Sequence, residues 1–172
     1  MITLVNAPSV LGLRPSGVEL LPDALKKAGL IERLGITRTE TTRPPAYNPK
    51  RDPATNMLNP YGLASYSVQL ADAVQKTVLA KDFPLVLGGD CSIILGNMLG
   101  LRRLGRYGLF FLDGHADFYQ PEASGTGEAA DMDLALVSGR GPSVVTNIEG
   151  RRPLVRDMDI VQFGQRDRNL TV

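Results

Sequence analysis

The sequence of 172 residues has little of several features, and each shortage excludes a class of protein. A single cysteine, Cys91, leaves no possibility of an internal disulfide bond or of a zinc site built from several thiolates. Basic and acidic residues number 19 and 18, so the net charge of +1 lacks the positive excess of proteins that bind nucleic acids or anionic membranes. No stretch is long and apolar enough to cross a bilayer, and the N-terminus does not resemble a signal peptide. We therefore expect a cytoplasmic protein with neither nucleic-acid nor membrane partners.

Short apolar runs alternate with segments of helical spacing along the chain. The apolar runs PLVL and GLFFL are typical of strands buried on both faces. The alternation predicts a single α/β domain built on a parallel sheet with right-handed crossovers. Strands are predicted within 2–6, 84–89, 107–113 and 158–167, and helices within 18–30, 65–80, 92–105 and 131–141.

Residues 43–60 contain five prolines and no periodic pattern, which predicts a long loop. Such a loop could form a wall of an active site or a plain surface connection, and the sequence does not separate the two.

The motif DGHAD follows one predicted strand directly and contains the only histidine of the chain. In an extended segment alternate side chains share one side, so Asp113, His115 and Asp117 could converge at the sheet edge where ligands of α/β proteins bind. Carboxylates and an imidazole suit manganese, zinc or iron better than calcium. The alternative is a polar turn in which the aspartates cap a helix and the histidine has ordinary hydrogen bonds.

The motif GGDCS follows the preceding predicted strand. Its glycines permit a tight turn, and Asp90 or Ser92 could cap the next helix. Cys91 at a helix start could have a lowered pKa and act as a nucleophile with His115, or it could be a buried and inert cysteine. The glycine patterns of the common nucleotide-binding loops are absent.

Together these segments resemble the ureohydrolase family, which comprises the arginases, agmatinases, formiminoglutamases and their relatives. The family versions of the two motifs are G-G-D-H-S and D-A-H-x-D, and the resemblance extends to GVELLPDALKKAGLIERLG and to DIVQFGQRD. It implies an α/β fold with three α/β/α layers around a mainly parallel sheet. Residues 1–172 would form one incomplete domain of this arginase-like type, corresponding to the N-terminal portion.

The resemblance also implies a metal-dependent hydrolase that cleaves a C–N bond of a small guanidino or amidine compound. Intact members bind two Mn²⁺ ions. By position, Asp113 would bridge both ions, His115 and Asp117 would each bind one, and Cys91 would stand in the place of a histidine ligand. Two cations lower the pKa of a shared water and so produce hydroxide at neutral pH. Members commonly form homo-oligomers, either trimers or hexamers.

Several positions depart from the family pattern. A thiolate at Cys91 suits zinc or iron better than manganese. Ala130 stands where arginases keep a proton-shuttle histidine, and no second D-x-D-x-x-D-P motif is present. Two other aspartate pairs do not replace the missing carboxylates. We interpret the pair 131 and 133 as charges favoured at a helix N-terminus, and the pair 157 and 159 precedes a strand and so lies at the opposite edge of the sheet.

We therefore expect weak metal affinity and little activity of this chain by itself. A non-catalytic arginase-like protein or interaction module is the alternative, and a thiol hydrolase using Cys91 is a third reading. An open apolar strand such as IVQFG predicts self-association.

Overall fold

A computed structural model of the chain describes residues 1–166. Most of the expected elements are present, and short 3₁₀ turns connect several of them. The strands are β1 (Ile2–Ala7), β2 (Arg38–Thr41), β3 (Phe83–Gly88), β4 (Leu109–Leu112) and β5 (Ile160–Phe163). The α-helices are α1 (Leu21–Lys27), α2 (Leu30–Leu34), α3 (Pro60–Leu79), α4 (Ile94–Leu104), α5 (Asp133–Val137) and α6 (Ser143–Thr146).

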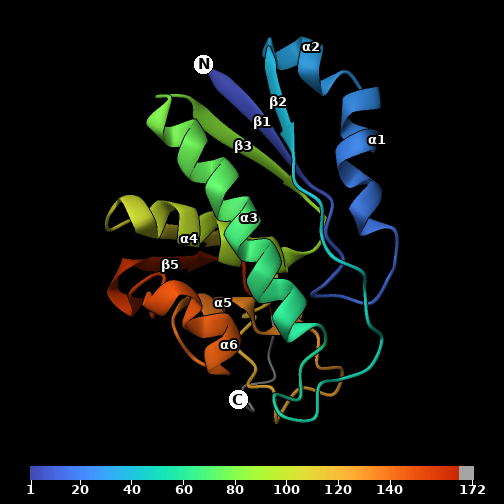
Figure 1. The fold of residues 1–172 in the computed structure, drawn as a ribbon, viewed down its shortest axis with the longest axis vertical. Helices are drawn as coiled ribbons and strands as arrows, with labels where there is room; N and C mark the ends of the chain where they lie inside the picture. The colour runs from blue at the N-terminus through green and yellow to red at the C-terminus, as the bar shows by residue number, and fades with distance from the viewer. Residues whose placement is uncertain (167–172) are drawn as a thin grey trace.

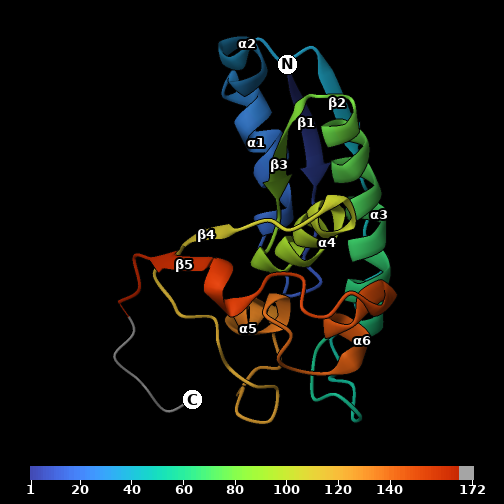
Figure 2. The same cartoon turned by 90° about the vertical axis from the view of Figure 1, so that its left-hand side faces the viewer.

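Three of the strands form a parallel sheet in the order β2-β1-β3. Helices α1 and α2 cover one face of this sheet and α3 covers the other, as both views show (Figures 1 and 2). The central strand β1 is therefore enclosed on both sides, and its residues Leu4 and Val5 are fully buried. This arrangement confirms the predicted three-layer α/β fold.

Strands β4 and β5 form a second, separate parallel sheet. Within residues 1–166 no ladder joins β3 to β4, although α4 connects them along the chain. The expectation of one sheet was therefore wrong for the described residues. Apolar runs predict strands but do not reveal which strands pair, because pairing depends on contacts distant in sequence.

The second sheet leaves one of its faces open. Phe110 and Leu112 of β4 lie opposite Val161 and Phe163 of β5, and the rings of Phe110 and Phe163 stack with centroids 6.3 Å apart. All four side chains are more than half exposed, whereas Phe111 on the other face is buried. The prediction that this run is buried on both faces was wrong. The exposed apolar face is the kind of surface that another chain covers.

Helix α4 packs closely against α3 because two of its residues are glycines. A Cβ atom at Gly96 would lie 2.7 Å from the Leu70 Cβ, and one at Gly100 would lie 2.8 Å from the Ala71 carbonyl oxygen. These glycines, which lower the intrinsic helix propensity, are explained by the close approach of the two helices.

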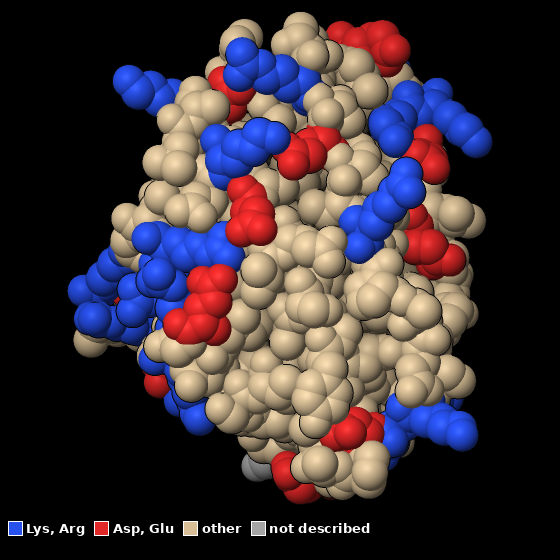
Figure 3. Space-filling model, in the orientation of Figure 1, with Lys and Arg blue, Asp and Glu red and all other residues tan. Residues whose placement is uncertain are grey.

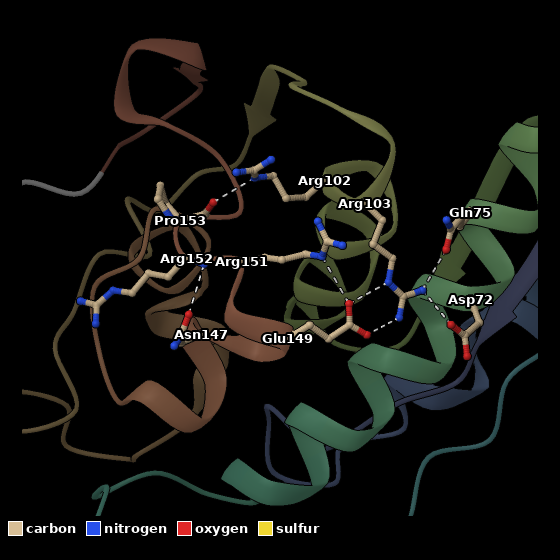
Figure 4. A network of polar contacts seen from close by, with 9 residues as sticks. All are labelled: Asp72, Gln75, Arg102, Arg103, Asn147, Glu149, Arg151, Arg152 and Pro153. Carbon is tan, nitrogen blue, oxygen red and sulfur yellow. Dashed lines mark hydrogen bonds and ion pairs between the residues drawn. The ribbon is translucent and has the colours of Figure 1, made fainter.

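Polar contacts add to the packing of α3 on α4 at the surface. The Arg103 guanidinium of α4 donates to both carboxylate oxygens of Glu149, to Asp72 and to Gln75 (Figure 4). Its side chain is only 10% exposed, and Glu149 and Asp72 are partly in contact with water. The network therefore ties α3 and α4 to the turn that follows α6.

The proline-rich segment 43–59 contains no helix or strand beyond one isolated bridge between Arg51 and Leu58. It lines an open hollow of about 600 Å³ with residues such as Pro45 and Pro53, and none of the predicted site residues lines this hollow. The loop was thus correctly predicted, and its role as a site wall is unsupported by this cavity.

Basic and acidic side chains lie next to one another on the face drawn in Figure 3, around a broad area without charge. Among residues 1–166, no helix has the length and apolar character needed to cross a bilayer.

Candidate metal centre

The end of β3 is held against the segment that follows β1. A Cβ atom at Gly89 would lie 2.0 Å from the Ser9 carbonyl oxygen, so only glycine permits this approach. The Asp90 N–H donates to the same Ser9 oxygen at 3.0 Å. The two strand ends thereby fix the backbone on which Asp90 and Cys91 are placed.

Asp90 caps the turn that leads into α4. Its Oδ1 accepts a hydrogen bond from the Ser92 N–H at 2.9 Å, which confirms the capping role proposed from the sequence. The other oxygen, Oδ2, is buried and has no hydrogen-bond partner among the described residues. Asp90 is 3% exposed, so this oxygen is also cut off from water.

Asp113 directly follows β4 and is held by β5. Its N–H donates to the Phe163 carbonyl oxygen at 3.1 Å, and its Oδ1 accepts from the His115 N–H at 2.9 Å. The His115 Nδ1 lies 3.7 Å from the same Asp113 oxygen, and the imidazole is 72% exposed. The structure therefore brings Asp113 and His115 together at the edge of the second sheet.

Asp117 faces the interior instead. It is 6% exposed and has a positive φ of 46°, and its carbonyl oxygen accepts a hydrogen bond from the Ala135 N–H at 3.2 Å. The segment from Asp113 to Asp117 is not an extended strand, so the extended geometry assumed from the sequence is absent. Within residues 1–166, no three His, Cys, Asp or Glu side chains stand close enough together to hold a metal ion as they are. The ligand set Cys91, Asp113, His115 and Asp117 stays a prediction.

The Cys91 thiol lies in a negative environment. Burial of the thiol, and then the charges of Asp133, Asp117, Asp113 and Asp90, raise the pKa of Cys91 to about 12. A nucleophilic Cys91 would need a lowered pKa, so the raised pKa favours the alternative of an inert cysteine. A bound cation would reverse the local charge and favour the thiolate.

Asp133, the first residue of α5, is a buried carboxylate that the sequence did not reveal as part of this region. It has no exposed surface, and neither of its oxygens has a hydrogen-bond partner in the described part of the chain. Burial, followed by the charges of Asp117 and Asp113, raises the pKa of Asp133 well above its usual value. The interpretation as a surface charge at a helix start missed this burial. Its only sequence signal is a carboxylate placed directly before the apolar run LALV.

The remaining candidates lie elsewhere, as expected. Asp159 forms a bidentate ion pair with Arg106, which precedes β4, and Asp157 does the same with Arg140. Both aspartates precede β5 and therefore lie at the opposite strand end from Asp113. The Ala130 N–H donates to the Gly12 carbonyl oxygen, and its side chain offers no group for proton transfer.

The donor chemistry of this region fits a hard divalent cation. Three buried carboxylate oxygens, one on Asp90 and two on Asp133, lack any hydrogen-bond donor among the described residues. Buried carboxylates without donors are costly unless a positive charge offsets them. Oxygen ligands suit Mn²⁺, whereas the protonated thiol of Cys91 does not.

Comparisons with known proteins agree with this arrangement. The model of the arginase family matches residues 2–171. The chain is 32% identical to the arginase of Bacillus subtilis over 169 residues, covering 96% of this chain and 57% of that protein. It is 31% identical to the arginase of Bacillus caldovelox over 174 residues, with 96% and 58% covered. The chain thus spans less than three fifths of the length of these relatives, and it matches their N-terminal part.

Solved structures give the same result. The arginase structure from Bacillus caldovelox superposes with a TM-score of 0.86 at 31% identity, over 96% of this chain and 58% of that one. The arginase structure from Bacillus subtilis gives a TM-score of 0.84 at 30% identity, over 97% and 57%. The formimidoylglutamase of Bacillus subtilis, at 14% identity and a TM-score of 0.59, shares the fold alone. The chain belongs to the arginase family.

Proposed function

We propose that the chain carries part of the metal site of a hydrolase that cleaves a C–N bond of a small guanidino or amidine compound. The observation that supports this most is the position of Asp113 and Asp117 after β4, within electrostatic range of Cys91 after β3. Membership of the arginase family supports the reaction class. The cytoplasmic location and the assembly into a homo-oligomer stay parts of the same proposal.

The residues that would hold the metal are Asp113, His115 and Asp117, with Cys91 at the fourth position. A divalent cation there supplies a lowered pKa for bound water. The chain's own groups prepare the site: the His115 N–H fixes one Asp113 oxygen, and Gln162 donates to the His115 carbonyl oxygen at 2.7 Å, which orients this turn against β5. If Cys91 serves as a thiolate, zinc or iron is a better match than manganese.

Two departures from the family motifs support a second candidate function, that of a non-catalytic protein. Cys91 replaces a histidine ligand and Ala130 replaces the proton-shuttle histidine of arginases, as the sequence comparison with the family motifs indicated. A non-catalytic arginase-like protein, or an interaction module, would tolerate both changes. The exposed apolar face of β4 and β5 favours this second candidate, because it offers a surface for another chain.

Two measurements on the purified chain separate these candidates. Calorimetric titration with Mn²⁺ and with Zn²⁺ gives the affinity and the number of ions, and colorimetric detection of urea or amine gives the activity on a panel of guanidino and amidine compounds. Metal-dependent product release that is lost in Asp117→Asn supports the hydrolase. Metal binding without any release supports the non-catalytic protein. Tight binding of two Mn²⁺ ions would contradict the expectation of an incomplete site.

A further inference from the structure

Asp133 occupies an unusual environment for a charged residue. Every residue of the short helix α5 is buried, and Asp133 itself has no exposed surface. A buried carboxylate normally accepts hydrogen bonds, because these offset the free-energy cost of removing its charge from water. Neither oxygen of Asp133 has a partner with hydrogen-bond geometry among the described residues, and the Leu134 N–H is the one donor that acts on its carboxylate.

The backbone holds Asp133 beside the predicted metal ligands. The Ala135 N–H donates to the Asp117 carbonyl oxygen at 3.2 Å, and the Tyr119 N–H donates to the Asp131 carbonyl oxygen at 3.1 Å. These two bonds place the chain from 117 to 119 alongside the chain from 131 to 135. Asp133 therefore lies next to Asp117 as a consequence of main-chain hydrogen bonding.

The charges around Asp133 have the same sign as its own. Asp117, Asp113 and Asp90 are the charged groups that influence it most. Asp90 itself has a buried oxygen without a donor. Mutual repulsion and missing donors both destabilise this group of carboxylates, and a single divalent cation would relieve both. Oxygen ligands without hydrogen-bond donors are what a hard metal ion requires, although the described side chains would have to move closer together to enclose one.

We propose that the Asp133 carboxylate binds the divalent cation together with Asp117, as an oxygen ligand on the side of the site where Cys91 provides a poor one. This inference rests on the proposed metal site and extends it, because residue 133 is outside the ligand set implied by the family motifs. The turn Cys91–Ile93 contacts the turn Ala129–Asp131 that leads into α5, and after burial Asp133 is the first of the charges that raise the pKa of the Cys91 thiol. A hard oxygen there also restores a preference for Mn²⁺ that the sulfur alone would weaken.

The test compares Asp133→Asn with Asp131→Asn, using Mn²⁺ alone as the probe. Asparagine keeps the shape of the side chain and removes its charge. The control residue Asp131 lies two positions away; its Oδ2 accepts hydrogen bonds from Ser124 and Thr126, and only its Oδ1 is buried without a partner among the described residues. Thermal unfolding is measured with and without Mn²⁺, and the Mn²⁺ affinity is measured by calorimetry.

We expect metal-free Asp133→Asn to be at least as stable as the wild type, because the substitution removes an unpaired buried charge. Its Mn²⁺ affinity should fall by a factor of about ten or more, the scale seen when groups of a metal site are removed. Its melting temperature should then rise less with Mn²⁺ than that of the wild type, since the stabilisation by a bound ligand falls as its dissociation constant grows. Asp131→Asn should keep the wild-type affinity.

The outcomes separate this inference from the proposed function. If Asp117→Asn loses Mn²⁺ binding while Asp133→Asn retains it, Asp133 is only a buried neutral acid and the inference is overturned. If the wild type does not bind Mn²⁺, the proposed metal site fails and the role of Asp133 fails with it. A measurement on the wild type covers the case in which the variant does not fold: Mn²⁺ should slow amide hydrogen exchange across Asp133–Val137, and unchanged exchange there would overturn the inference.

Discussion

Replacing Gly89 by alanine tests how the ends of two strands build the candidate site. The added Cβ atom would lie 2.0 Å from the Ser9 carbonyl oxygen and 2.6 Å from the Ser9 nitrogen. Real Cβ atoms essentially never approach another atom within 3.0 Å, so the two segments must separate by at least about 1 Å. Both atoms belong to the backbone, and no side-chain rotation can relieve the contact.

The cost follows from two effects. Overpacking in a tight region destabilises by about 1–3 kcal/mol, and the separation also weakens the hydrogen bond from the Asp90 N–H to Ser9, worth about 1 kcal/mol. We expect a total of about 3 kcal/mol, which for a chain of this length lowers the melting temperature by roughly 6–12 °C. Because Asp90 and Cys91 follow directly, the Mn²⁺ affinity should fall as well.

Circular dichroism during heating and during urea titration measures the effect on stability. Gly125→Ala is the matched control, since a Cβ atom there would have no neighbour within 4 Å. It should leave the stability unchanged or raise it by up to about 1 kcal/mol. A Gly89→Ala chain as stable as the wild type, or a control that loses as much stability, would refute the steric reasoning.

Three further predictions concern other parts of the molecule. Gly100→Ala should lower the free energy of unfolding in urea by about 1–2 kcal/mol, because the added Cβ atom would lie 2.8 Å from the Ala71 carbonyl oxygen. This clash outweighs the gain in helix propensity of about 1 kcal/mol. An increase in stability would contradict the close packing of α3 and α4. The hydrogen bond from the Thr3 hydroxyl is the main cause that lowers the pKa of Asp82 in the folded state. The ionised carboxylate therefore stabilises the folded state at pH values above its unfolded pKa of about 3.9. The stability difference between the wild type and Asp82→Asn should therefore shrink as pH falls below about 4, and a difference independent of pH would count against it. Phe163→Asp should reduce self-association in light scattering, and equal scattering by both proteins would show that the exposed face of β4 and β5 is not responsible.

The sequence was sufficient to predict the long helices and most strands. Leu70, Val74 and Val78 recur at helical spacing and lie in α3, as expected. Strand β2 was not predicted, because its residues RTET contain no apolar run, and it is recognisable only through its pairing with β1. The split into two sheets was also beyond the sequence, since β3 and β4 have the same apolar character whether or not they pair.

For the candidate site, the motifs predicted which residues lie at the strand ends but not how their side chains are turned. Asp113 and His115 lie together, whereas Asp117 is buried and has a positive φ, and the ligand role of all three stays a prediction. Asp133 was correctly assigned to a helix start, but its burial was not predicted because it comes from packing against segments distant in the sequence. The sequence left open whether Cys91 is an activated nucleophile or an inert cysteine, because the burial and the neighbouring carboxylates that raise its pKa arise only in the folded chain.

The most direct test of the cation site is a titration of the wild-type chain with Mn²⁺, followed by the electron paramagnetic resonance signal of the free ion. The signal is lost when the ion enters a protein site, so it reports binding even when the affinity is low. We predict saturable loss of the signal at about one ion per chain, with the loss abolished in Asp117→Asn. A signal that stays equal to that of a solution without protein would contradict the account.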